Sequence, residues 1–157
     1  MQLAEKIESA PLTKKAESKP LSIRRIIATV NPSKKCEATV RYASEIAGRH
    51  DATLYLCYVF WPSIRNQGQH YDSIDREQRE FRRQLEVLAD QARGSVPICK
   101  SAFLVGHPAE RISMLAHDIL ADLIVTASSD AIVTQLLTVD MAGKMPCPVL
   151  VYQDNNS

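Results

Sequence analysis

Residues 122–137, DLIVTASSDAIVTQLL, contain the side chains best suited to hold an anion. An apolar run typical of a buried strand leads through Ala127, Ser128, Ser129 and Asp130 into a segment with helical spacing. A strand-to-helix turn of this kind often binds phosphate, and it then usually contains glycine, because glycine lets backbone N–H groups approach the anion closely. This turn has no glycine, so it is an emptied site, an altered site, or no site at all.

Catalytic chemistry finds little support in the rest of the sequence. Ser33 lies in NPSKK, which lacks the nucleophile-elbow pattern, and no histidine is placed by the sequence to activate it. His107 and Glu110 open a helical segment, where such a pair is more often an exposed cap than an acid–base catalyst. We therefore predict no catalytic residue and no enzymatic activity.

The cysteines and histidines are too scattered to predict a metal site. There are four of each, and no two cysteines form a CxxC pair. Small apolar thiols are usually buried, and we expect that here for most of the cysteines, which are Cys36, Cys57, Cys99 and Cys147.

Composition narrows the class of protein. The 157 residues suggest one domain, and a hydrophobic content of 45% supports a packed core. The net charge of +1 gives no global field for nucleic acid, and no apolar run is long enough to suggest a membrane span. Without a stretch of signal-peptide length, we expect a cytoplasmic protein. Residues 1–21 are expected to be a flexible tail, residues 22–153 the folded domain, and residues 154–157 a C-terminal tail.

Strand and helix patterns alternate along the folded domain. Apolar runs predict strands at 23–30, 52–60, 96–106, 122–128 and 147–153. Helical spacing predicts helices at 33–50, with Ser33 as N-cap and Gly48 as C-cap, at 73–92, at 107–120, and after residue 128. This alternation predicts a five-stranded parallel sheet, doubly wound in three α/β/α layers, with ligands bound beyond the carboxyl ends of its strands.

Three segments together resemble the universal stress protein family. They are RRIIATVNPS, VGHPAERISMLAHDILADLIVTAS and MPCPVLVYQ, and the resemblance covers residues 23–153. It implies a Rossmann-like fold similar to the adenine nucleotide alpha-hydrolases, with strand order 3-2-1-4-5 and a role in stress response. It also implies frequent dimerisation, and one branch of the family binds ATP.

The resemblance implies a degenerate form of the ATP site. The family's aspartate after the first strand falls on Asn31, its loop glycines fall on Ala127 and Asp130, and its Gly-Ser pair falls on Leu137 and Thr138. Ser33, Val59, Gly106 and Ser128 still fit the family's pattern. Together with the replaced positions, the candidate nucleotide- or ligand-binding residues are Asn31, Ser33, Val59, Gly106, Ala127, Ser128, Asp130 and Thr138.

The replacements weigh against ATP. In the first turn of the following helix, the Asp130 carboxylate would itself gain roughly 0.3–1 kcal/mol from the helix dipole. It would repel a phosphate about 4 Å away by roughly 1–4 kcal/mol. We predict a loop that supplies its own anion and needs no cofactor. An altered site for ATP, AMP or another small anion stays open, since bound magnesium could reverse the charge argument.

The last strand is predicted to form a dimer interface. In the order 3-2-1-4-5 it lies at an edge of the sheet, and CPVLVYQ has no Lys or Glu to protect it. We predict a homodimer centred on Val149, Val151 and Tyr152, with the N-terminal tail as the alternative cover for this edge. The two functional hypotheses are a dimeric regulatory module with an unknown protein partner, and a small-ligand or nucleotide sensor.

Overall fold

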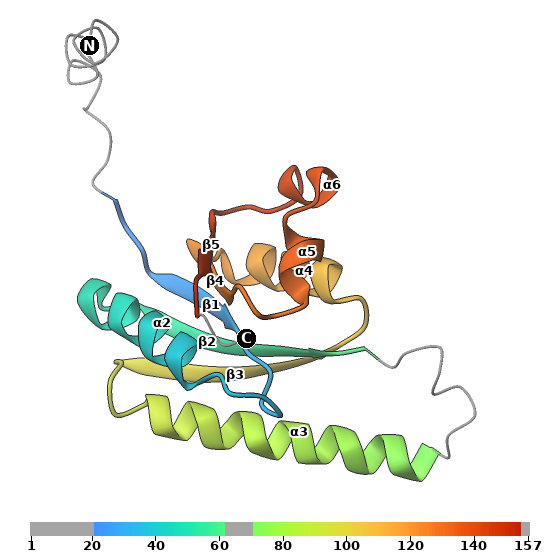
Figure 1. Cartoon of the computed structure of the whole chain (residues 1–157). Coiled ribbons are helices and arrows are strands. Elements are labelled where there is room, and N and C mark those ends of the chain that lie inside the picture. The colour runs from blue at the N-terminus through green and yellow to red at the C-terminus, as the bar shows by residue number, and fades with distance from the viewer. Residues whose placement is uncertain (1–20, 62–70, 155–157) are drawn as a thin grey trace, which may run out of the picture.

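The computed structural model describes residues 21–61 and 71–154. All but one residue of the expected N-terminal tail (1–21) and of the expected C-terminal tail (154–157) therefore lies outside the described residues. A parallel sheet of five strands forms the centre, in the order β3-β2-β1-β4-β5 (Figure 1). The strands are β1 (Arg25–Thr29), β2 (Thr53–Phe60), β3 (Ile98–Val105), β4 (Leu123–Ala127) and β5 (Val149–Tyr152). The predicted fold class and strand order are confirmed.

Helices cover both faces of the sheet (Figure 1). One face packs against α2 (Glu37–His50) and α3 (Tyr71–Ala92). The other packs against α4 (Pro108–Ile119), α5 (Ile132–Leu136) and α6 (Val139–Ala142). The single helix expected after residue 128 is therefore two short helices.

The two layers of core follow the two-residue period of the strands. Ile26 and Ala28 of β1 pack in the core beneath α2 and α3, whereas Ile27 between them packs beneath α4. Burial on both faces explains why the central strands are mostly apolar. Among the described ranges, no helix is long and apolar enough to cross a membrane.

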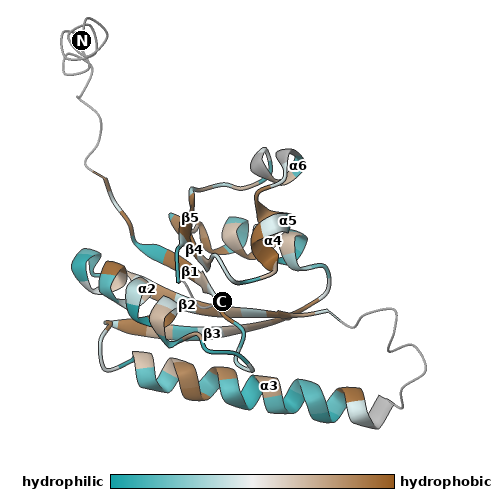
Figure 2. Cartoon of the chain, in the orientation of Figure 1, coloured by the Kyte–Doolittle hydropathy of each residue, from teal (hydrophilic) through white to brown (hydrophobic). Residues whose placement is uncertain are grey.

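The long helix α3 has one apolar face. Leu85, Ala89 and Ala92 are buried, while its charged residues from Asp75 onward are exposed and include an ion pair of 2.6 Å between Arg83 and Glu80. Figure 2 shows the helix mostly hydrophilic beside a hydrophobic sheet. The alternating charges of α3 therefore form a solvated face.

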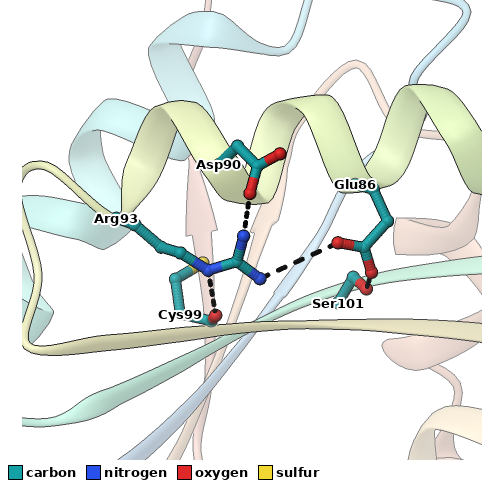
Figure 3. A network of polar contacts seen from close by, with 5 residues as sticks. All are labelled: Glu86, Asp90, Arg93, Cys99 and Ser101. Atoms are coloured by element: carbon teal, nitrogen blue, oxygen red, sulfur yellow. Dashed lines mark hydrogen bonds and ion pairs between the residues drawn. The ribbon is translucent and has the colours of Figure 1, made fainter.

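A polar network attaches the end of α3 to the edge strand β3 (Figure 3). Arg93 donates from Nε to the carbonyl oxygen of Cys99 at 3.0 Å and pairs with Asp90 and, at 3.8 Å, with Glu86. Glu86 in turn accepts a hydrogen bond from the hydroxyl of Ser101. The network fastens the end of α3 to β3, which is an edge strand of the sheet.

Both caps expected for α2 are wrong. Ser33 is held in a turn, where its N–H and hydroxyl donate to Asn31 Oδ1 at 3.0 and 2.7 Å, so the helix begins later with Cys36 as N-cap. Pro32 is well suited to such a turn, because its fixed φ matches the position after Asn31. Gly48 lies inside the helix, and Asp51 takes the left-handed C-cap conformation at φ 54°.

Candidate functional site

A divided cleft lies at the carboxyl ends of β1 and β4, the point at which the strand order reverses. Its larger cavity, about 250 Å³, lies between the end of β2 and helices α4 and α5. Its smaller cavity, about 70 Å³, lies between the loops that follow β1 and β4. Both cavities are lined by Thr29, Val30, Asn31, Asp130 and Ala131.

The larger cavity has mainly apolar walls. Val59, Ile112 and Ile132 line it, together with Trp61, which is 53% exposed and meets the His107 ring edge-on at 5.1 Å. Gln135 also lines it, and its Oε1 atom is buried with no hydrogen-bond partner among the described residues. A cavity of this kind suits a small and largely apolar group that can donate one hydrogen bond.

Asn31 reaches both cavities, but its acceptor oxygen is already used. Oδ1 accepts both hydrogen bonds from Ser33, and the backbone carbonyl of Asn31 accepts from Lys34 N at 3.0 Å. A nucleoside would have to compete with this turn for the side-chain oxygen. Ser33 itself lines neither cavity and instead faces a separate groove beside the first half of α3.

Two serines after β4 bind a carboxylate from the far end of the chain. Ser128 donates from Oγ to Asp154 Oδ1 at 2.9 Å, and Ser129 donates to Asp154 Oδ2. The backbone N–H of Asp154 donates to Ser128 Oγ at 3.4 Å, and Ser128 N donates to the Tyr152 carbonyl at 2.8 Å. The hydroxyls of this loop are therefore occupied by an internal anion.

Asp130 supplies a second carboxylate at the same loop. It lies one residue before Ala131, the N-cap of α5, and not in the first turn as expected. Its Oδ1 nevertheless accepts from Ile132 N at 3.1 Å, so it does serve an N–H at the start of the helix. Burial raises the pKa of Asp130, the Ile132 N–H and the charge of Lys34 lower it, and the charge of Asp154 raises it.

The other candidate residues fall in different places. Val59 lines the larger cavity and Ala127 the smaller, while Ser128, Gly106 and Thr138 line neither. Gly106 turns the chain from β3 into α4 at φ +136°, and a Cβ there would lie 2.6 Å from Arg111 Nε. Thr138 is the N-cap of α6, and its Oγ1 accepts from Met141 N at 3.3 Å.

Sequence reasoning missed several residues of the cleft. Lys34 and Lys35 line the smaller cavity, and their place directly after Asn31 was a usable signal. Trp61 follows the second strand directly and could have been found in the same way. Gln135 and Asp154 carried no such signal, because only tertiary packing brings Gln135 to the larger cavity and Asp154 to the serines after β4.

The thiols at the cleft are not nucleophiles at neutral pH. Burial raises the pKa of Cys57, which lines the larger cavity, to about 12, and that of Cys36, which lines the smaller, to about 11. A thiol with such a pKa stays protonated and unreactive near pH 7. Within 21–61 and 71–154, no group of three or more His, Cys, Asp or Glu side chains is placed to hold a metal ion.

The expected dimer interface lies on the edge strand β5. Val149, Val151 and Tyr152 are each half-buried, and β5 pairs with β4 alone. The Tyr152 ring stacks on Tyr42 of α2, with centroids 4.7 Å apart. The strand is thus well packed on its own sheet and free of a strand partner on its outer side within the described chain.

Comparisons with known proteins agree with this architecture. Residues 22–153 match the sequence model of the Universal stress protein family, and a search of curated proteins found no match. Universal stress protein UspA from Lactobacillus plantarum superposes with a TM-score of 0.69 at 19% identity, covering 85% of this chain and 100% of that chain. The universal stress protein from Archaeoglobus fulgidus in complex with dAMP gives 0.61 at 20% identity, covering 85% and 100%. A universal stress protein in complex with cAMP gives 0.56 at 20% identity, covering 84% and 98%.

Proposed function

Because the chain belongs to the universal stress protein family over residues 22–153, we propose that it is a cytoplasmic, homodimeric regulatory module of the stress response. In this proposal it acts through contacts with another protein and not as an enzyme, and it does not bind ATP in the usual way. The observation that carries the proposal is the loop after β4, where two serine hydroxyls hold the carboxylate of Asp154.

The charge of this loop argues against a triphosphate. Asp130 and Asp154 place two carboxylates at the loop after β4, and the Cβ of Ala127 narrows the approach to its backbone. A like charge about 4 Å away opposes binding by roughly 1–4 kcal/mol. Lys34 and Lys35 offset part of this repulsion, since both line the smaller cavity.

The edge strand supports the proposal of a dimer. Within the described residues β5 has no strand neighbour on its outer side, and an apolar edge without Lys or Glu favours pairing with a second strand. Pairing of β5 with its copy would make a symmetric interface that covers Val149, Val151 and Tyr152.

One observation favours a second candidate function, a sensor of AMP-type ligands. The larger cavity has mainly apolar walls, and Gln135 Oε1 inside it lacks a partner among the described residues. Relatives of known structure are described in complex with dAMP and with cAMP. A nucleoside portion could use this cavity even where the phosphate-binding loop does not favour a triphosphate.

Calorimetric titration with ATP, ADP and AMP, with and without magnesium, tests the nucleotide part. We expect no saturable binding of ATP below millimolar concentration. Micromolar ATP binding that Asp130→Lys weakens would contradict the proposal and show a site rebuilt without glycine. Binding of AMP alone would favour the sensor.

Sedimentation of variants tests the dimer. We expect Val151→Lys to give monomers at concentrations where the unaltered chain is dimeric, because it buries a charge in the apolar pairing. Val105→Lys makes the same change on the opposite edge strand, β3, and should leave the dimer intact. A monomeric unaltered chain, or a dimeric Val151→Lys variant, would defeat this part of the proposal.

A further inference from the structure

The pairing of β4 with β5 brings the Asp154 carboxylate onto the loop after β4. Ala127, at the end of β4, lies opposite Tyr152, at the end of β5. Ser128 follows the first and Asp154 lies two residues beyond the second, so both leave the sheet at the same edge. Each oxygen of the Asp154 carboxylate then accepts one serine hydroxyl, from Ser128 and from Ser129.

In this arrangement the Asp154 carboxylate takes two hydroxyl donors that could otherwise bind a phosphoryl group. Two hydroxyl donors are aimed at two oxygens of one anion, which matches the way polar groups bind an oxyanion. Ser129 also lines the smaller cavity, and so do Lys34 and Lys35. An external oxyanion at Ser129 would therefore have cations within reach, but would meet the charge of Asp154.

We propose that Asp154 is an autoinhibitory group, whose carboxylate occupies the hydroxyls of Ser128 and Ser129 and so excludes the phosphate of a nucleoside monophosphate. The inference rests on the proposed function, because it explains what keeps the same loop from binding nucleotides. It goes further because it attributes the exclusion of phosphate to the Asp154 carboxylate, and not to the missing glycines alone.

The alternative role for Asp154 is purely structural. In that case the carboxylate only fastens the chain after β5 to the sheet, and its removal lowers stability without opening a site. The two roles differ in one property, which is the selectivity of the variant for ligands that carry a phosphate.

The test compares the full chain with Asp154→Asn, which keeps the shape of the side chain and removes its charge. AMP is the phosphate-bearing probe and adenosine the matched probe without phosphate, both titrated by calorimetry. Asp118→Asn is the control, because it removes the same charge from an exposed position near the far end of α4. We expect Asp154→Asn to bind AMP at least about fivefold more tightly than the unaltered chain. Adenosine binding should not change, and Asp118→Asn should behave like the unaltered chain.

Two further measurements keep the result interpretable. Circular dichroism and thermal melting establish that Asp154→Asn is folded, and adding Ser129→Ala to it should remove most of the gain for AMP. Equal AMP affinity in a folded Asp154→Asn variant, or an equal gain for adenosine, would overturn the inference. Tight ATP binding by the unaltered chain would instead overturn the proposed function, so the two failures are distinguishable.

Discussion

Two buried threonines join the strands that flank the cleft. Thr29 at the end of β1 donates from Oγ1 to Thr126 Oγ1 of β4 at 2.7 Å, and both residues are at most 3% exposed. A buried hydroxyl that loses its partner keeps the full cost of its desolvation, whereas removing both partners together is much less costly. The pair therefore adds a buried side-chain contact to the backbone pairing of β1 and β4 beneath both cavities.

A double-mutant cycle on this pair should show strong coupling. Thr126→Val leaves the Thr29 hydroxyl without its acceptor, and we expect it to lower the free energy of unfolding by about 1–3 kcal/mol. Thr29→Val with Thr126→Val should cost clearly less than the sum of the single changes. Urea denaturation of the four proteins provides the measurement, and strictly additive values would contradict the assignment.

Asp130 should make stability depend on pH in an unusual direction. Its pKa in the folded chain is raised above 3.8, chiefly by burial, so the native state holds the proton to higher pH than the unfolded chain does. The stability linked to this group is complete below pH 3.8 and is lost as the pH rises through the raised pKa.

Replacing Asp130 by Asn removes this dependence and retains an acceptor for the Ile132 N–H. The stability of Asp130→Asn relative to the unaltered chain should therefore increase as the pH is raised from about 3.5 to about 6. Urea denaturation at a series of pH values measures the difference. A flat difference, or one that falls with pH, would show that burial does not dominate at this carboxylate.

At the scale of elements, α2 and α4 end in the same strained way. Their C-caps, Asp51 and Leu120, adopt left-handed conformations at φ 54° and 56°, although neither is glycine. Asp tolerates this region better than Leu, because its short polar side chain can hydrogen-bond locally. Leu120 is also 71% exposed, so little packing offsets its strain.

Leu120→Gly should therefore stabilise the protein. Relief of the left-handed strain is worth about 1–2 kcal/mol, and the added freedom of the unfolded chain takes back about 0.4–1 kcal/mol. We expect a net gain of about 0.5–1 kcal/mol, measured as a higher midpoint of thermal unfolding. Leu88→Gly, inside α3, is the contrasting variant and should destabilise. A lower midpoint for Leu120→Gly would mean that its side chain contributes packing.

At the scale of the whole molecule, the periodic features were predictable from sequence and the contacts between distant residues were not. Mostly apolar runs predicted β1 and β4, because burial on both faces leaves few polar positions in a strand. The cap of α2 failed because Asn31 and Ser33 form a turn that competes with helix initiation. The site was only partly predictable. Asn31 and Asp130 line the same cavity, as the sequence suggested. The contact of Asp154 with Ser128 was not predictable, because it joins residues 26 apart through the pairing of β5 with β4.

The position of β5 gives the two proposals a thermodynamic consequence. The strand carries Val149, Val151 and Tyr152, its Tyr152 carbonyl accepts from Ser128 N, and Asp154 follows it closely. If pairing with a second copy changes the hold of Asp154 on the loop, dimer formation and nucleotide binding are reciprocally coupled. Dimer formation would then change the affinity for AMP by some factor. Each bound AMP would change the dissociation constant of the dimer by that same factor. A regulator built in this way would report ligand concentration as a change in its assembly.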